Sequence, residues 1–204
     1  MTFALSAESV ACIRGGRTVF SGVGFALAAG GALRLEGPNG AGKTSLLRLL
    51  AGFLPAAAGR VTLYKDGTAV TEAEERGAYV GWCGERDAVK AQLTVRELLS
   101  FHARLYRRGG VDAALSRFGL SALAERPGRT LSAGQKRRLA LARLWLSGRP
   151  LWLMDEPLSA LDAAGRAMVT AAVAEHRASG GIVVAASHEA LGFAAETLRL
   201  GGKA

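Results

Sequence analysis

A glycine-rich stretch at residues 37–44 has the residue types that bind phosphate. Its order, Gly-Pro-Asn-Gly-Ala-Gly-Lys-Thr, fits G-x-x-x-x-G-K-[ST]. Glycines let successive backbone N–H groups turn toward phosphate oxygens, and a following helix N-terminus attracts anions. The motif predicts that Lys43 reaches the β- and γ-phosphates of a nucleotide and that Thr44 ligates Mg²⁺. A plain glycine-rich turn before a surface helix is the alternative, and the Gly-Lys-Thr spacing disfavours it. The residues expected to bind nucleotide here are Gly37, Pro38, Asn39, Gly40, Ala41, Gly42, Lys43, Thr44 and Ser45.

Two adjacent carboxylates follow an apolar run at residues 151–154. A buried strand would deliver Asp155 to the carboxyl edge of a sheet, where nucleotides bind in open α/β folds. Asp155 is placed to hold Mg²⁺, directly or through water. Glu156 is the natural general base for an attacking water, a role that contributes about 10²–10⁴-fold in rate. A solvated strand exit is the alternative, which the phosphate loop disfavours.

Residues 131–135, Leu-Ser-Ala-Gly-Gln, form a second candidate anion site. Ser132 and Gln135 fit a capping box, so the segment opens a helix whose N-terminus attracts anions. Many nucleotide hydrolases have the first two motifs without this one. A small-molecule kinase with the same phosphate loop would give this segment no role.

The elements that must position these residues alternate along the chain. Short strands are expected at residues 2–13, 17–27, 32–36 and 60–64. A helix follows the phosphate loop, with Leu46, Leu47 and Leu50 on one face and Gly52 at its end. The last third gives a strand at 151–154, a helix at 166–178 and a strand at 182–186. This alternation predicts an α/β fold with a parallel sheet covered on both faces.

The middle of the chain is expected to be helical. Thr94 and Glu97 form a capping box that opens a helix to about residue 108, a short helix covers 112–118, and the Ser132 helix ends near 147–148. We therefore predict one domain of 1–204, in which 1–87 and 148–204 form the α/β core and 88–147 form an inserted helical lobe.

Composition restricts the class of protein. The 204 residues are half hydrophobic, and 26 basic against 17 acidic residues give a net charge of +9. That charge fits either a polyanionic partner or a solvated basic surface. Two distant cysteines, Cys12 and Cys83, favour a reducing compartment, and no Cys-x-x-Cys-His run exists for covalent heme attachment. We expect no signal peptide, and the apolar runs are too short to span a bilayer.

The basic triplet at residues 136–138 has two interpretations. It could contact nucleic acid, or it could be the exposed face of the helix that follows Ser132. We favour the exposed face and expect no nucleic-acid partner, because no aromatic stacking residues accompany the charges.

The segment at 131–135 resembles the LSGGQ signature of ABC ATPases, with alanine in place of one glycine. In that family the signature of one subunit closes on ATP held by the other, so the resemblance implies an ATP-dependent homodimer in which Ser132, Gly134 and Gln135 contact the partner's nucleotide. Residues 159–162 match the family's dimer-contacting D-loop. His188 matches the switch histidine that senses the γ-phosphate and acts with Glu156 in catalysis, although a lone histidine there is more often structural. The implied fold is a P-loop ATPase core, with a parallel sheet and an antiparallel β subdomain, and an inserted helical lobe.

The chain departs from the ABC pattern at two positions. Glu85 stands where the family usually has glutamine. Its carboxylate could still bind Mg²⁺ through water, but would add negative charge to the site. The aromatic residue that stacks on adenine is missing near the N-terminus. Arg14 could stack there instead, or could be a solvated arginine; both readings stay open.

Nearly the whole chain is similar to the ATP-binding subunits of bacterial cytochrome c maturation, a heme-exporting subfamily. The resemblance rests on LSAGQKRRLALARLWLS and LWLMDEP, on Phe20-Ser21-Gly22, and on Gly180-Gly181 ahead of Ser187-His188. It implies a peripheral subunit on the cytoplasmic side of the inner membrane, bound to a CcmB-like integral membrane permease and associated cytochrome c maturation proteins. ATP hydrolysis would drive heme export or the release of a heme-loaded chaperone. The alternatives are the ATPase of another small ABC transporter, and an ABC protein acting on DNA or ribosomes, which only the net charge supports.

Overall fold

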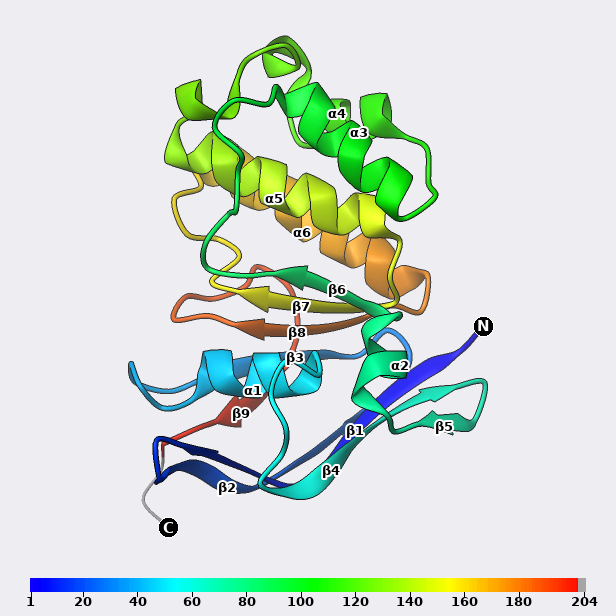
Figure 1. Ribbon diagram of the computed structural model, residues 1–204, viewed down its shortest axis with the longest axis vertical. Helices are drawn as coiled ribbons and strands as arrows, with labels where there is room; N and C mark the ends of the chain where they lie inside the picture. The colour runs from blue at the N-terminus through cyan, green and yellow to red at the C-terminus, as the bar shows by residue number, and fades with distance from the viewer. Residues whose placement is uncertain (202–204) are drawn as a thin grey trace.

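The computed structural model describes residues 1–201 and contains two β-sheets with helices around them (Figure 1). One sheet is antiparallel, with strand order β2-β1-β4-β5. Its strands are β1 (Phe3–Arg14), β2 (Arg17–Leu27), β4 (Ala58–Lys65) and β5 (Thr68–Val70). This sheet agrees with the antiparallel β subdomain that the family resemblance implied.

The second sheet is parallel, with strand order β6-β7-β8-β3-β9. Its strands are β3 (Ala32–Glu36), β6 (Val80–Cys83), β7 (Leu151–Asp155), β8 (Ile182–Ala186) and β9 (Glu196–Arg199). Every residue of β7 and β8 is buried, as expected for central parallel strands covered on both faces. The phosphate loop, the two carboxylates and His188 therefore all follow the carboxyl ends of neighbouring strands.

Helices cover both faces of the parallel sheet. Figure 1 shows α5 and α6 along one face and α1 on the other, toward the antiparallel sheet, while α3 and α4 lie beyond α5. The helices are α1 (Lys43–Leu50), α2 (Ala73–Gly77), α3 (Val95–Leu105), α4 (Val111–Arg117), α5 (Ala133–Ser147) and α6 (Ala163–Ala178), with short 3₁₀ turns at Ser121–Leu123 and Gly128–Thr130.

The parallel sheet separates two apolar cores. Trp152 and Met154 point into the core beneath α3, α5 and α6, whereas Leu151 and Leu153 point into the core shared with α1 and the antiparallel sheet. This alternation follows from the two-residue period of a strand. The strand β7 thus contributes to both cores.

The predicted elements form close to their expected places, with differences at several ends. The helix opened by Thr94 ends at Leu105 rather than near 108, and α6 begins three residues early because Asp162 caps it: Asp162 Oδ1 accepts a hydrogen bond of 2.8 Å from the Gly165 amide. The helix after the phosphate loop is capped by Ala51, with Gly52 following at φ +81°. The α2 helix and strands β5, β6 and β9 were not predicted. Within residues 1–201, no helix is both long and apolar enough to cross a membrane.

Candidate nucleotide site

The phosphate loop joins the end of β3 to the start of α1, as the sequence predicted. Gly42 caps α1 with φ +100°, a left-handed conformation that favours glycine. A Cβ atom there would lie 2.7 Å from Val19 Cγ1 and 2.8 Å from Phe20 Cδ1. The loop therefore needs glycine at this position both for its backbone conformation and for its contact with β2.

The Lys43 side chain folds back over its own loop. Its Nζ donates to the carbonyl oxygens of Gly37 at 2.7 Å and Pro38 at 3.2 Å, and the residue is only 8% exposed. An ammonium group has three donors, so one remains after these two contacts. The side chain is held at the mouth of the loop, where a bound phosphate would lie.

Thr44 and Asp155 meet although 111 residues separate them. Thr44 Oγ1 donates to Asp155 Oδ2 at 2.7 Å. Burial raises the pKa of Asp155, the hydrogen bond from Thr44 opposes that shift, and the negative charge of Glu85 adds to it. A hydroxyl and a carboxylate are oxygen ligands of the kind that Mg²⁺ prefers. Residues 1–201 contain no cluster of three His, Cys, Asp or Glu side chains able to hold a metal.

Glu156 directly follows Asp155 at the end of β7 and lies beside His188, which follows the neighbouring strand β8. His188 Nε2 is 3.5 Å from Glu156 Oε1, and the His188 amide donates to Glu156 Oε2 at 3.4 Å. Glu156 Oε1 is buried and accepts no hydrogen bond from any residue in 1–201. Glu156 itself has φ +48°, an uncommon conformation for a residue with a side chain. Glu156 lines the cavity beside His188, a position suited to taking a proton from water.

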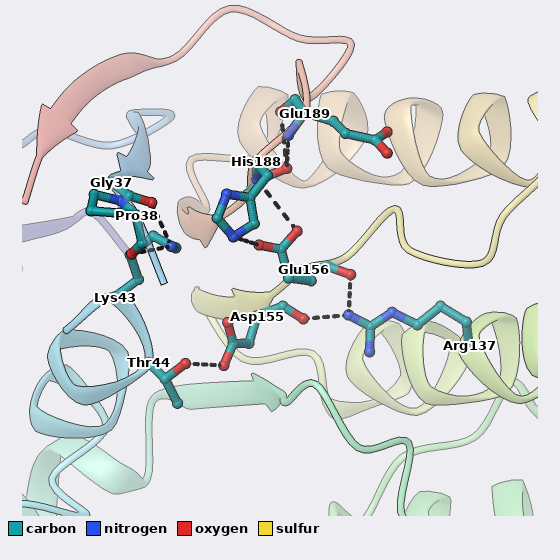
Figure 2. A network of polar contacts seen from close by, with 10 residues as sticks. Gly37, Pro38, Lys43, Thr44, Arg137, Asp155, Glu156, His188 and Glu189 are labelled. Atoms are coloured by element: carbon teal, nitrogen blue, oxygen red, sulfur yellow. Dashed lines mark hydrogen bonds and ion pairs between the residues drawn. The ribbon is translucent and has the colours of Figure 1, made fainter. Parts of the chain in front are cut away.

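These groups line one cavity of about 540 Å³. Figure 2 shows Asp155 and Glu156 between Thr44 and His188 on one side and Arg137 on the other. The lining residues are Arg14, Val19, Asn39, Gly40, Gly42, Lys43, Thr44, Ser45, Glu85, Asp155, Glu156 and His188. Among the predicted loop residues, Gly37, Pro38 and Ala41 do not line it: Ala41 is buried, and the other two present their carbonyls to Lys43.

Both positions that depart from the ABC pattern reach the cavity. Glu85 lines it next to the carboxylates, and Arg14 lines it at the end of β1. Val19 is a lining residue that sequence reasoning missed. The sequence around Val19 gives no indication of this role. The residue reaches the cavity because it packs closely against Gly42, a contact that only the structure shows.

The signature residues lie outside this cavity. Ser132 Oγ accepts from the Gln135 amide at 3.3 Å, and the Ser132 amide donates to Gln135 Oε1 at 2.9 Å, which completes the predicted capping box. Ser132 is exposed, and a Cβ atom on Gly134 would lie 2.7 Å from the Ala160 carbonyl oxygen. The signature turn and residues 159–162 are therefore neighbours on the surface, available to something outside the chain.

The prediction that residues 136–138 form an exposed face is wrong for Arg137. Arg137 is 1% exposed and donates hydrogen bonds to Gly84, Asp87, Asp155, Glu156 and Pro157. A charged side chain can be buried when hydrogen bonds and an ion partner compensate it. Three adjacent basic residues are typical of a solvated surface, and the sequence alone does not show how closely α5 packs against β6 and β7.

Comparison with known proteins gives consistent matches. Residues 20–159 match the ABC transporter family. The chain is 54% identical to the cytochrome c biogenesis ATP-binding export protein CcmA of Paramagnetospirillum magneticum, over 90% of this chain and 87% of that protein. It is 48% identical to the CcmA of Nitrobacter winogradskyi, over 98% and 99%. Among solved structures, an ATP-binding protein of a putative ABC transporter from Pyrococcus furiosus has the same fold, with a TM-score of 0.83 at 23% identity, covering 97% of both chains.

Proposed function

The chain belongs to the ABC transporter family, and from that premise we propose that it is the ATP-hydrolysing subunit of a complex that exports heme, or releases a heme-loaded chaperone, in cytochrome c biogenesis. The main support for ATP hydrolysis is the cavity where the Thr44–Asp155 pair lies beside Glu156 and His188. The similarity to CcmA proteins supports the assignment to cytochrome c biogenesis.

The geometry supports separate roles for residues of the cavity in binding or hydrolysing ATP. Lys43 would exchange the carbonyls of Gly37 and Pro38 for the β- and γ-phosphates of ATP. Thr44 and Asp155 would hold Mg²⁺, which neutralises phosphate charge when bound. Glu156, which lines the cavity, would accept a proton from the attacking water through its carboxylate. His188 would orient Glu156 and contact the γ-phosphate.

The exposed signature supports an active dimer. Ser132, Gly134 and Gln135 do not reach the chain's own cavity, and each has a place in a second copy's site by resemblance to the family. In the proposed dimer, ATP therefore lies between the phosphate loop of one copy and Ser132 of the other. Each chain holds half of two sites.

A surface with exposed aromatic and aliphatic groups supports a membrane partner. Phe53, Phe101 and Leu105 are about 60% exposed, and a small cavity of 210 Å³ is lined by Trp82, His102 and Tyr106. Phe53 packs edge-on against Trp82, and Phe101 against His102. Exposed apolar clusters mark interaction sites. We name these six residues the aromatic surface and propose that it binds a CcmB-like permease, so that the chain is peripheral on the cytoplasmic side of the inner membrane.

The test is to replace the chromosomal gene with one encoding Glu156→Gln. Loss of the general base should lower ATP turnover about 10²–10⁴-fold and leave ATP binding intact. Covalently heme-bearing c-type cytochromes, measured by heme staining of membranes, should disappear. Normal c-type cytochromes in this strain would refute the pathway. Turnover close to that of the unaltered protein would refute the role of Glu156.

A further inference from the structure

Arg137 stands apart from the other basic residues of α5. It is 1% exposed, whereas Lys136 and Arg138 on either side are partly exposed. Burying a guanidinium is costly unless its donors are satisfied. All five of its N–H groups have an acceptor here, which only the planar fork of arginine can arrange.

The acceptors belong to two segments that carry site residues. Nη1 donates to the Gly84 carbonyl at 2.7 Å and to Asp87 Oδ1 at 3.1 Å, on either side of Glu85. Nη2 donates to the carbonyls of Asp155 and, at 2.6 Å, of Glu156. Nε donates to the Pro157 carbonyl at 3.3 Å.

Three successive carbonyls thus turn toward one guanidinium at the point where β7 ends. The middle one belongs to Glu156, whose φ of +48° is costly for a residue with a side chain and persists only where surroundings hold it. With the backbone fixed from behind, the carboxylates of Asp155 and Glu156 point the other way, toward Thr44 and His188 (Figure 2). Arg143 of the same helix also binds the loop of Glu85, at the Ala88 and Asp87 carbonyls, so that loop has a second anchor.

Arg137 also connects these segments to the signature. It lies five residues after Ser132, the residue that caps α5 and is exposed outside the cavity. A helix is stiff over this distance, so a shift of its N-terminal end would also move Arg137 and change its hydrogen bonds.

We propose that Arg137 is a positioning residue for ATP hydrolysis: it fixes the backbone of Asp155 and Glu156 and ties their placement to the signature helix. The roles of Glu156 and Ser132 in this inference rest on the proposed function. Arg137 touches neither nucleotide nor water, and acts through the two carboxylates. Contact of Ser132 with a second copy would thereby affect the base in the chain's own cavity.

The test compares Arg137→Lys with Arg138→Lys in the full chain, co-purified with its membrane partner. Arg138 is a matched control, because within residues 1–201 its hydrogen bonds go to the carbonyls of Phe118 and Gly119, away from both carboxylates. We expect Arg137→Lys to lower kcat about 10–100-fold, the loss typical when a group supporting a catalytic residue is removed. Its Kd for a fluorescent ATP analogue should stay within about threefold of the unaltered protein, and Arg138→Lys should match the unaltered protein in both.

A second measurement reads the backbone without any turnover. Amide hydrogen exchange should quicken in a peptide covering residues 155–159 in Arg137→Lys, and not in Arg138→Lys. Unchanged kcat, or equal loss of kcat and ATP binding, would overturn the proposal, and so would unchanged exchange at 155–159. If the unaltered protein itself hydrolyses no ATP, the proposed function fails, and the exchange measurement alone decides whether Arg137 holds this backbone.

Discussion

At the scale of single residues, the site depends on hydrogen bonds between groups that lie far apart in the chain, such as Thr44 with Asp155 and Arg137 with Gly84. The sequence predicted that Thr44 and Asp155 serve one ion, and the structure joins them by a hydrogen bond of 2.7 Å. Because the basic triplet has no aromatic stacking residues beside it, the sequence predicts an exposed face at Arg137. Its acceptors are almost all backbone carbonyls of distant segments, and these leave no trace in residue types.

Glu85 offers a residue-scale prediction about pH. Its negative charge contributes to the raised pKa of Asp155. Replacing it in Glu85→Gln should lower that pKa, so Asp155 should stay ionised, and able to hold Mg²⁺, to lower pH. We expect the acidic limb of the pH–kcat profile to move toward lower pH, and turnover at neutral pH to rise, since one negative charge near the phosphates is lost.

The control for Glu85→Gln is Glu74→Gln, which removes an exposed carboxylate in α2 that does not line the cavity. That variant should keep the profile of the unaltered protein. An acidic limb that does not move in Glu85→Gln would show that the two carboxylates do not interact in the working enzyme.

At the scale of elements, the sequence revealed those that pattern or caps define. β7 and β8 were recognisable as short apolar runs, and α3 and α5 by their capping boxes. β9 and α2 were missed because neither has an apolar face: β9 is mostly exposed, and α2 is a five-residue charged turn. Contacts with other parts of the chain stabilise α2, since its buried Arg76 donates to the carbonyls of Leu50, Val61 and Thr71.

The contact of α6 with β7 gives an element-scale prediction for stability. His176 of α6 stacks on Trp152 of β7 with ring centroids 3.9 Å apart, and its Nε2 is 3.1 Å from the Pro150 carbonyl oxygen. Burial lowers the pKa of His176 to about 4. The unfolded chain takes up this proton near pH 6.5 and the folded chain only near pH 4, so stability falls as the pH drops through that range. From pH 7 to pH 5 the loss should be about 2 kcal/mol for this group.

Urea unfolding at pH 7 and pH 5 measures this loss. His176→Gln keeps a side-chain donor for Pro150 and does not titrate, so the difference in unfolding free energy between the two pH values should shrink by about that amount, whatever its effect at pH 7. An unchanged difference would mean that His176 is not buried in its neutral form.

At the scale of the whole molecule, the cavity and the signature occupy separate places on one chain. This separation leads to a prediction for Ser132→Arg. An arginine on the exposed signature turn should block a second copy sterically, and should leave the chain's own cavity intact. In a Glu156→Gln background, ATP should drive dimer formation that Ser132→Arg abolishes, measured by light scattering, while ATP affinity stays within about threefold. Ser121→Arg, at another exposed serine, is the control; a dimer that survives Ser132→Arg contradicts the shared site.

The aromatic surface leads to a second whole-molecule prediction. Phe101→Glu places a charge among exposed apolar groups and should reduce the amount of chain recovered with membranes at least about tenfold. Losing a side chain that anchors an interface costs about 2 kcal/mol or more, which exceeds a tenfold change in affinity. Ile13→Glu serves as the comparison, because Ile13 is equally exposed but lies on the antiparallel sheet. ATP binding should persist in both. Membrane recovery that is unaffected by Phe101→Glu, or equally reduced by Ile13→Glu, would place the permease elsewhere.

The strand β7 joins the two apolar cores and ends at both site carboxylates. Melting of either core would loosen this strand, even if the other core stayed intact. The temperature at which hydrolysis stops is therefore set by the weaker core, and heat inactivation should precede the loss of the last helical signal if the two cores melt separately. Because of the position of β7, the loss of ATPase activity on heating should report the melting of the less stable core.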